Sequence, residues 1–368
     1  MLRDWFAGLL NLKPNRKPPT SQICWIEAAE NPWGVPILDV RPLTLTTTST
    51  SKDPTCAANA ASFRVDNGTG FVDVEPAIDR EVAADLRFRI QNPLVDGVLF
   101  VPRVMEEKWA LFYHQERIIC VRSWTRQVRA VAEVEPRHDY VRVKEIRGAL
   151  TAEDEEPEMT VRVLEYLLIS HALDIVFPAP LPPEWGTQGP APSECDAGTA
   201  AVACMSLFGR RAHFAAAEPV ERSWLEQPLR TDSLLHIAAA RGDLEAVDSL
   251  LSSGVPIDLE SRRGLTSLHW AAAVGGREVM GYLLERGAAV DARSDEGSTS
   301  MMAAAKAGEA AATAFLLEHG ADVDARDGRG YTALHRAAEG EHGEVVQLLL
   351  ERGAEPGVLA EGRTAAES

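Results

Sequence analysis

A 33-residue period in the C-terminal part of the chain constrains its fold more than any other feature. Hydroxyl residues recur at this interval at Ser233, Thr266, Thr299 and Thr332. Three residues after each of them stand His236, His269, Met302 and His335. The same period relates Gly254, Gly287, Gly320 and Gly353, and then Asp258, Asp291 and Asp324, with Gly357 in the fourth place. Such a period indicates stacked repeat units, because one unit of this length cannot bury its apolar face alone.

Within each unit the sequence predicts a glycine turn, a short alanine-rich helix, a glycine break and a second, amphipathic helix such as "EVMGYLLERG" or "EVVQLLLERG". Alanine pairs, for example Ala271 with Ala272 and Ala337 with Ala338, allow neighbouring helices to approach closely. Leucine pairs such as Leu283 with Leu284 supply apolar area that the next unit covers. We therefore expect a stack of helix pairs.

Residues 231–356 resemble four ankyrin repeats, with units at 231–263, 264–296, 297–329 and 330–356. The resemblance implies an all-α helical solenoid that binds another protein. It also implies that the Thr and His at each helix start hydrogen-bond locally and to the adjoining loop, so we interpret Thr266, His269, Thr332 and His335 as structural. A catalytic reading of these pairs is disfavoured, because an active site would not be copied in every unit.

The chain departs from the family pattern at several points. The proline that usually follows the threonine is replaced by Leu234, Ser267, Ser300 and Ala333. The third unit has Met302 in place of histidine and an alanine-heavy second helix, so we expect it to be the weakest joint. We predict a helical N-terminal cap over 196–230, with Cys204 and His213 as packing residues, and a short partial C-terminal cap over 357–368.

The resemblance also places binding on the turn tips and on the exposed side of the first helices. The candidate partner-binding residues are Arg241, Arg262, Arg263, Leu265, Trp270, Arg293, Lys306, Arg326, Arg329 and Tyr331. Arginine beside tyrosine and tryptophan is typical of binding hot spots. We therefore expect a protein partner with an acidic or mixed-charge patch. The alternative is that these are solvated turn residues paired with Asp295, Glu296 and Asp327.

Residues 21–176 predict an α+β domain, a mainly antiparallel sheet of roughly six to eight strands with at least one helix. "ADLRFRI" alternates apolar and polar residues, and "KWALFYHQERIICVRSW" predicts two strands around a tight turn at Gln115 and Glu116. Asn67–Gly68 is a hairpin signal, and "MTVRVLEYLLISHAL" predicts an amphipathic helix. Residues 1–20 predict a short amphipathic helix with a basic, proline-containing tail, and 177–195 a Pro/Gly-rich linker.

The N-terminal part resembles no family that we recognise, and no phosphate-binding, zinc-protease or serine-hydrolase motif occurs in it. One candidate catalytic set combines His114, Cys120 and Ser123 with Trp109 and Trp124, but a cysteine in a strand is usually buried packing. Arg117, Arg122, Arg126 and Arg129 around Trp124 resemble a nucleic-acid strip, although a solvated sheet face explains them better. His171 near a helix end is explained by capping.

The composition argues against several further classes of function. A net charge of −18 argues against nucleic-acid binding and against docking on anionic lipid. Five cysteines without a C-x-x-C pair indicate neither a disulfide framework nor a zinc finger, and with no long apolar run we expect a cytoplasmic protein. No cofactor or metal is expected, and a small-molecule ligand is not favoured.

The function that this sequence favours is a non-enzymatic protein–protein interaction module. One alternative is an enzyme whose active site lies in the N-terminal domain, with the repeats selecting its substrate. A pocket that unites His114, Cys120 or His171 would favour that alternative, and their burial apart would argue against it. A further alternative is an inhibitor or immunity-type protein that binds one partner.

Overall fold

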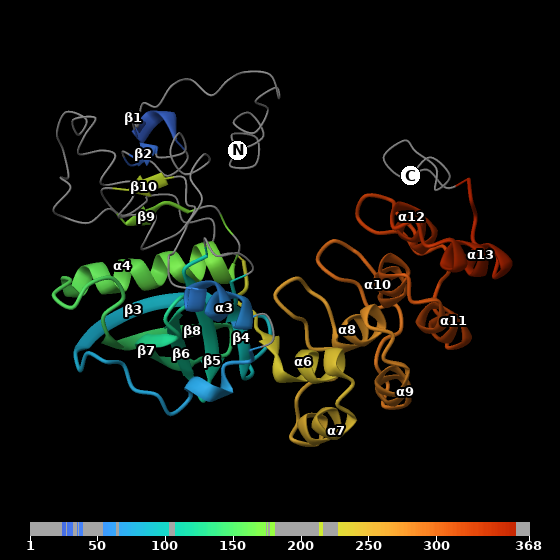
Figure 1. Cartoon of the computed structure of the whole chain (residues 1–368), viewed down its shortest axis with the longest axis horizontal. Coiled ribbons are helices and arrows are strands. Elements are labelled where there is room, and N and C mark those ends of the chain that lie inside the picture. Colours follow the sequence, from blue (N-terminus) through green and yellow to red (C-terminus); the bar gives the residue numbers. More distant parts are fainter. Residues whose placement is uncertain are drawn as a thin grey trace. The chain divides into compact units, whose positions relative to one another are not determined.

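The computed structural model describes residues 24–26, 28–31, 35, 37–39, 54–63, 66–102, 107–173, 175, 177–180, 213–215 and 227–357. They form two compact units (Figure 1). The first comprises Met1–Leu94 and Val98–Leu229, and the second comprises Val95–Gly97 and Arg230–Ser368.

The first unit is built on a mainly antiparallel sheet, as predicted. Its strands lie in the order β4 (Gly97–Phe100), β5 (Trp109–His114), β6 (Arg117–Arg122), β7 (Gln127–Pro136), β8 (Tyr140–Gly148) and β3 (Glu81–Arg89). Strands β5 and β6 pair directly and are joined at Gln115 and Glu116, whose φ angles are 50° and 58°. Two successive left-handed residues are the geometry of a two-residue hairpin turn, so the predicted tight turn is confirmed.

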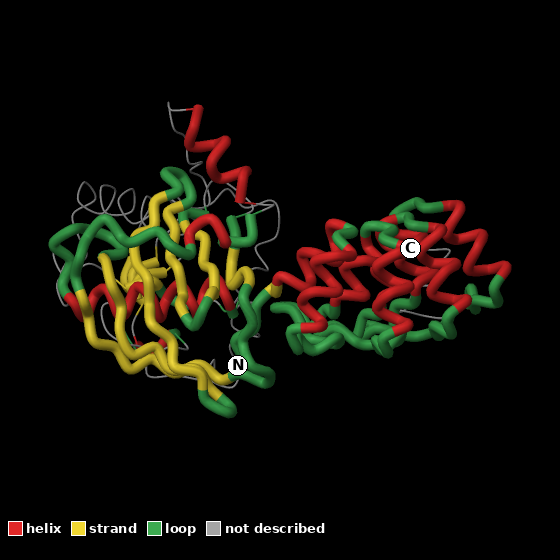
Figure 2. Tube along the Cα trace, turned by 90° about the horizontal axis from the view of Figure 1, so that it is seen from below, coloured by secondary structure: helices red, strands yellow, loops and turns green. Residues whose placement is uncertain are grey.

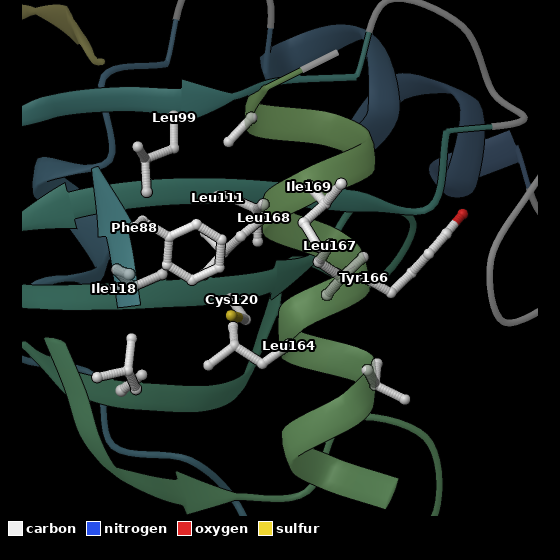
Figure 3. Close-up of a cluster of buried hydrophobic side chains, with 14 of the residues drawn as sticks. Phe88, Leu99, Leu111, Ile118, Cys120, Leu164, Tyr166, Leu167, Leu168 and Ile169 are labelled. Carbon is white, nitrogen blue, oxygen red and sulfur yellow. The ribbon is translucent and has the colours of Figure 1, made fainter. Parts of the chain in front are cut away.

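One face of this sheet is covered by α4 (Pro157–Leu167), which continues into the π-helical turn η4 (Leu168–Ala172). Pro157 stands in the first turn, where the missing N–H costs no hydrogen bond. Leu111, Ile118 and Cys120 of the sheet and Leu164, Leu167 and Leu168 of the helix belong to one buried cluster (Figure 3). The helix predicted from "MTVRVLEYLLISHAL" is confirmed and supplies one side of the main core.

A second aromatic layer forms around Phe112, whose side chain points away from that of its neighbour Leu111 because side chains alternate along a strand. Phe63, after α3 (Pro54–Ser62), and Phe71, in η3 (Thr69–Phe71), stack on Phe112 with ring centroids 5.7–6.2 Å apart. Gly68 adopts φ 84°, and a Cβ there would lie 2.4 Å from the Phe112 ring. The expected hairpin at Asn67–Gly68 is therefore wrong: Gly68 precedes η3, and tertiary packing on Phe112 requires the glycine.

A small second sheet combines distant segments of the same unit, in the order β1 (Cys24–Ile26), β2 (Ile37–Asp39), β10 (His213–Ala215) and β9 (Ala179–Pro180), with η1 (Ala28–Glu30) after β1. Strand β10 pairs antiparallel with β2 and parallel with β9. A strand at 213–215 differs from the helices that we expected over 196–230. Residues 1–20, 181–212 and 216–226 lie outside the described residues. These ranges contain the whole predicted N-terminal helix and most of the predicted cap and linker.

The second unit is a stack of four helix pairs that follow the short strand β11 (Asp232–Ser233). The pairs are α6 (Leu234–Arg241) with α7 (Leu244–Ser252), α8 (Ser267–Ala273) with α9 (Arg277–Glu285), α10 (Ser300–Ala307) with α11 (Ala310–Glu318), and α12 (Ala333–Glu339) with α13 (Gly343–Glu351). The first helices form one row and the second helices another, and the turns lie along one side (Figures 1 and 2). Ala239, Ala272 and Ala305 are fully buried in the first row, where small side chains permit close packing. The all-α solenoid is confirmed.

A distant piece of chain, Val95–Gly97, belongs to this second unit. The Thr231 hydroxyl donates to the carbonyl of Val95 at 2.9 Å, and the Leu234 N–H donates to the carbonyl of Asp96 at 3.0 Å. A Cβ at Gly97 would lie 2.4 Å from the carbonyl oxygen of Asp232. Glycine at this position is thus required by the close approach of two backbones at the start of the stack.

Candidate functional site

The Thr/His pairs that recur through the stack are helix caps. The imidazole Nδ1 of His269 lies 2.9 Å from the Thr266 hydroxyl and accepts from the Thr266 N–H at 3.2 Å. Ser233 with His236 forms the same arrangement, and so does Thr332 with His335. Each pair satisfies backbone donors at a helix start, which is the role of a capping box. Both partners of each pair are buried and engaged in these bonds, which supports the structural interpretation.

The opposite nitrogen of the ring connects the helix start to the loop that follows the second helix. Nε2 of His269 donates to the carbonyl of Ser298, and Nε2 of His236 donates to the carbonyl of Leu259, both at 3.0 Å. Burial lowers the pKa of His236 and His269 below the ordinary value of 6.5. A neutral ring accepts at Nδ1 and donates at Nε2, so one side chain holds a helix start and the next turn together.

The third repeat has no such connection. The Thr299 hydroxyl accepts from the Met302 N–H at 3.4 Å, so the cap remains, but the buried Met302 side chain offers only a sulfur, 3.8 Å from the Ser298 hydroxyl. The expected loss of a polar tether is present in the structure. Its effect on stability stays a prediction.

A second connection between repeats uses the periodic aspartates. Asp258 accepts from the Ala289 N–H at 3.2 Å, and Asp291 accepts from the Asp322 N–H at the same distance. Asp324 repeats the contact with the Glu355 N–H at 3.0 Å. No role for these aspartates is predicted from the sequence. Their period was the available signal.

The turn tips are closed by hydrogen bonds within each turn. The Ser261 hydroxyl accepts from the Leu265 N–H, and the Ser294 hydroxyl accepts from the Ser298 N–H, both at 3.1 Å. Asp327 takes this place in the fourth turn and accepts from the Tyr331 N–H at 2.9 Å. The tips are therefore rigid supports for the side chains that project from them.

The candidate binding residues differ in exposure. Those that are exposed are Arg241, Arg263, Arg293, Lys306, Arg326 and Arg329; those that are half-buried are Arg262, Leu265 and Trp270. Tyr331 is only 8% exposed, and the Arg336 guanidinium lies 4.4 Å from the centre of its ring. Arg336 in turn pairs with Asp327 and Glu339. Tyr331 thus offers little surface to a partner.

The charges along the tips fall into two groups. Toward the start of the stack, Arg263 pairs with Glu296 at 2.9 Å, and Arg230 lies between Glu260 and Asp295 at 2.7 and 2.8 Å. Further along, the exposed cations Arg293, Lys306 and Arg326 have no carboxylate within 4.0 Å among the residues that the structure describes. The Arg293 guanidinium instead donates to the carbonyl of Arg326 at 2.6 Å, which holds it beside the neighbouring tip.

Apolar side chains accompany these cations on the first helices. Trp270 is half-buried, with its ring 5.8 Å from that of His236, and Val274 at the end of α8 is 49% exposed. Ala273 and Ala307 are exposed at the matching helix ends. The exposed side of the first helices therefore combines apolar area with positive charge.

The residues proposed as an N-terminal catalytic set do not assemble. Cys120 pairs with Leu111 in the sheet and lies in the core under α4 (Figure 3), where burial raises the pKa of its thiol to about 12. His114 stands an odd number of residues from Leu111 and so points to the other face, where its Nε2 lies 2.7 Å from the carbonyl of Asn67. The Ser123 hydroxyl donates to the carbonyl of Glu107. No pair of these three side chains is in hydrogen-bond contact.

The arginines of the supposed nucleic-acid strip have separate structural contacts. Arg126 pairs with Asp66 and covers Phe63, Arg117 donates to Gln115, and Arg122 lies over Trp109. Burial, together with Arg129, lowers the pKa of Arg122 to about 10. Arg117, Arg122 and Arg126 are thus engaged by other residues of the same unit. His171 is likewise buried in η4, with Nδ1 2.7 Å from the Ser170 hydroxyl and its ring against Phe100.

No group of three or more metal-ligating side chains occurs among the described residues, and none of their helices has the length and apolar character needed to span a membrane.

The second unit, with its helix pairs, capped turns and repeated tethers, is a helical-repeat solenoid of the kind that binds other proteins. Residues 213–294 and 287–360 each match the family model described as ankyrin repeats (3 copies). The repeats of the second unit are thus ankyrin repeats, and such repeats generally form protein–protein interaction modules. No curated protein matches the chain.

Proposed function

We propose that the ankyrin stack binds a partner protein through its turn tips and the exposed side of its first helices, and that this binding, rather than catalysis, is the function of the chain. The observation that carries the proposal is the set of exposed cations Arg293, Lys306 and Arg326, which have no carboxylate within 4.0 Å among the described residues. A charge without an internal counterion is available to a partner without first breaking an ion pair.

The chemistry of the partner follows from what surrounds these cations. Trp270 and Val274 offer apolar contact on the first helices. We expect a partner surface that places carboxylates on Arg293 and Arg326 and an apolar side chain on Trp270. Arginine and tryptophan at the centre of an interface contribute more binding energy than most contacts. Arg263 contributes less than Arg293 and Arg326 in this proposal, because it is already paired with Glu296.

The test uses the full chain as bait in an extract of the cells that produce it, followed by binding measurements with each purified candidate. One variant carries Arg293→Glu, Lys306→Glu and Arg326→Glu. The matched control carries the same charge change within or directly after second helices, as Arg277→Glu, Arg286→Glu and Arg352→Glu, all at exposed positions. Circular dichroism checks that both variants are folded.

We expect the first variant to bind at least about tenfold more weakly and the control to bind like the wild type, since the loss of one hot-spot side chain already costs more than 1 kcal/mol. The affinity of the wild type should also fall with ionic strength, because exposed charges are screened. Equal losses in both variants would place binding on another face. If the wild-type chain binds no purified candidate directly, the proposal is wrong.

A further inference from the structure

The last repeat of the stack has a buried imidazole nitrogen with no acceptor. His335 is fully buried, and its Nδ1 is engaged by the Thr332 hydroxyl at 2.9 Å. Its Nε2 has no hydrogen-bond partner in the described part of the chain. The corresponding atoms of His236 and His269 both donate to a carbonyl. A buried donor without a partner is costly, which points to an acceptor that occupies this end of the stack.

The second repeat shows which acceptor this position takes. His269 donates to the carbonyl of Ser298, the residue between Gly297 and Thr299 in the next turn. The same Gly-x-Thr sequence occurs at 264–266, 297–299 and 330–332, and it occurs again at 362–364 as Gly-Arg-Thr, one residue closer than the period requires. Glu367 follows Thr364 at the spacing of a capping box. The sequence after the fourth repeat therefore contains the elements of another turn and helix start.

The described chain after α13 still follows the repeat. Ala354 is 5% exposed, as Ala288 and Ala321 are buried at the same place in the two preceding repeats. The Glu355 N–H donates to Asp324, continuing the aspartate connection of the earlier repeats. The backbone thus runs along the stack as far as these residues, only a few positions before 362.

We propose that residues 362–364, which lie outside the described part, dock on the end of the fourth repeat as a fifth turn, with the carbonyl of Arg363 accepting from Nε2 of His335. The end of the stack is then a docking surface for the chain's own C-terminal segment. The shorter spacing is absorbed in the loop between Gly353 and Gly362, since the contact needs only the Gly-x-Thr segment in place.

A pair of glycine substitutions tests this arrangement. The glycines that open the known turns are left-handed, with φ 71° at Gly264, 76° at Gly297 and 86° at Gly330. Gly362 must adopt the same conformation in a fifth turn, so Gly362→Val is incompatible with it. Gly357→Val is the matched control, because Gly357 is outside the left-handed region and a Cβ there meets nothing within 4 Å.

Hydrogen–deuterium exchange of the full chain follows the amides of α12 and α13 in both variants and in a chain that ends at Gly357. We expect exchange about tenfold faster in Gly362→Val and in the shortened chain, since a left-handed valine costs 1–2 kcal/mol. The Gly357→Val variant should exchange like the wild type. In ¹⁵N-edited spectra, assigned with His335→Gln, the Nε2–H proton should be protected from water only in the wild type and the control.

The remaining outcomes overturn the proposal. If the shortened chain exchanges like the wild type, nothing beyond Gly357 covers the end of the stack. If shortening accelerates exchange but Gly362→Val does not, the segment covers the end without a fifth turn. An Nε2–H proton that stays protected in the shortened chain would show that His335 has another acceptor.

Discussion

Nε2 of His269 lies 3.0 Å from the carbonyl oxygen of Ser298 and joins the first helix of one repeat to the turn of the next. The other side of the same ring caps its own helix through Thr266. One neutral side chain therefore couples local structure to stacking, and this explains why the pair recurs along the chain. The coupling depends on a histidine that is buried and uncharged.

Replacing this histidine should weaken the stack. We expect His269→Ala to lower the free energy of unfolding by about 2 kcal/mol. The substitution removes one of the two donors to the Ser298 carbonyl and leaves the Thr266 N–H without its acceptor. Urea unfolding followed by far-ultraviolet circular dichroism measures the change. His319→Ala is the control, since within the described part of the chain that exposed ring bonds only Phe315 of its own helix, and it should cost less than about 0.5 kcal/mol. Equal losses in the two variants would refute a coupling role for His269.

Introducing the missing tether should strengthen the third repeat. Met302→His places a ring beside Thr299, with the carbonyl of Tyr331 as the acceptor. Ser298 shows that such a carbonyl serves two donors, since it accepts from both Ser294 and His269 at 3.0 Å. We expect a gain of about 1 kcal/mol, measured by urea unfolding. Met301→His, at a neighbouring buried position, should instead destabilise; a gain there too would mean that tethering is not the cause.

The stability of the stack should fall with pH below neutrality. Burial lowers the pKa of His236 and His269 from 6.5 in the folded state, so the unfolded chain binds protons first as the pH falls. The contribution is complete above 6.5 and is lost as the pH falls from there through the lowered folded values. Urea midpoints between pH 7.5 and 5.5 test this. In His269→Met, which carries the residue natural to the third repeat, the dependence should be shallower; an unchanged slope would contradict the assignment.

The local part of this architecture was predictable because its causes are local. Helix α8 begins at Ser267, directly after the capping Thr266, and the β5–β6 turn lies at Gln115 and Glu116, as the sequence indicates. Turn chemistry and helix caps act within a few residues, so their signals survive in a short stretch of sequence. The period then extends one such assignment to every repeat.

The non-local part was not predictable from one sequence. Gly68 is required by the ring of Phe112, strand β10 pairs with residues more than a hundred positions earlier, and Val95–Gly97 joins a unit that begins at Arg230. At the candidate site, the position of a residue in the repeat predicts whether its side chain reaches a turn tip. It does not predict which residue that side chain pairs with. Arg263 is neutralised by Glu296, whereas Arg293 bonds only carbonyls among the residues that the structure describes. Such choices depend on rotamers and neighbours that a sequence does not display.

The buried thiol of Cys120 in the first unit allows a test of the alternative that the chain is an enzyme with this cysteine as its nucleophile. Burial raises the pKa of Cys120 to about 12, so the thiolate that a nucleophile requires is scarce at neutral pH. We expect iodoacetamide at pH 7.5 to leave Cys120 unmodified in the native chain while it labels the half-buried Cys56 faster, as peptide mass spectrometry after digestion would show. In urea both should react at similar rates, which controls for intrinsic reactivity. Rapid native labelling of Cys120 would mean that its thiol is activated and open to solvent, and would revive the catalytic alternative.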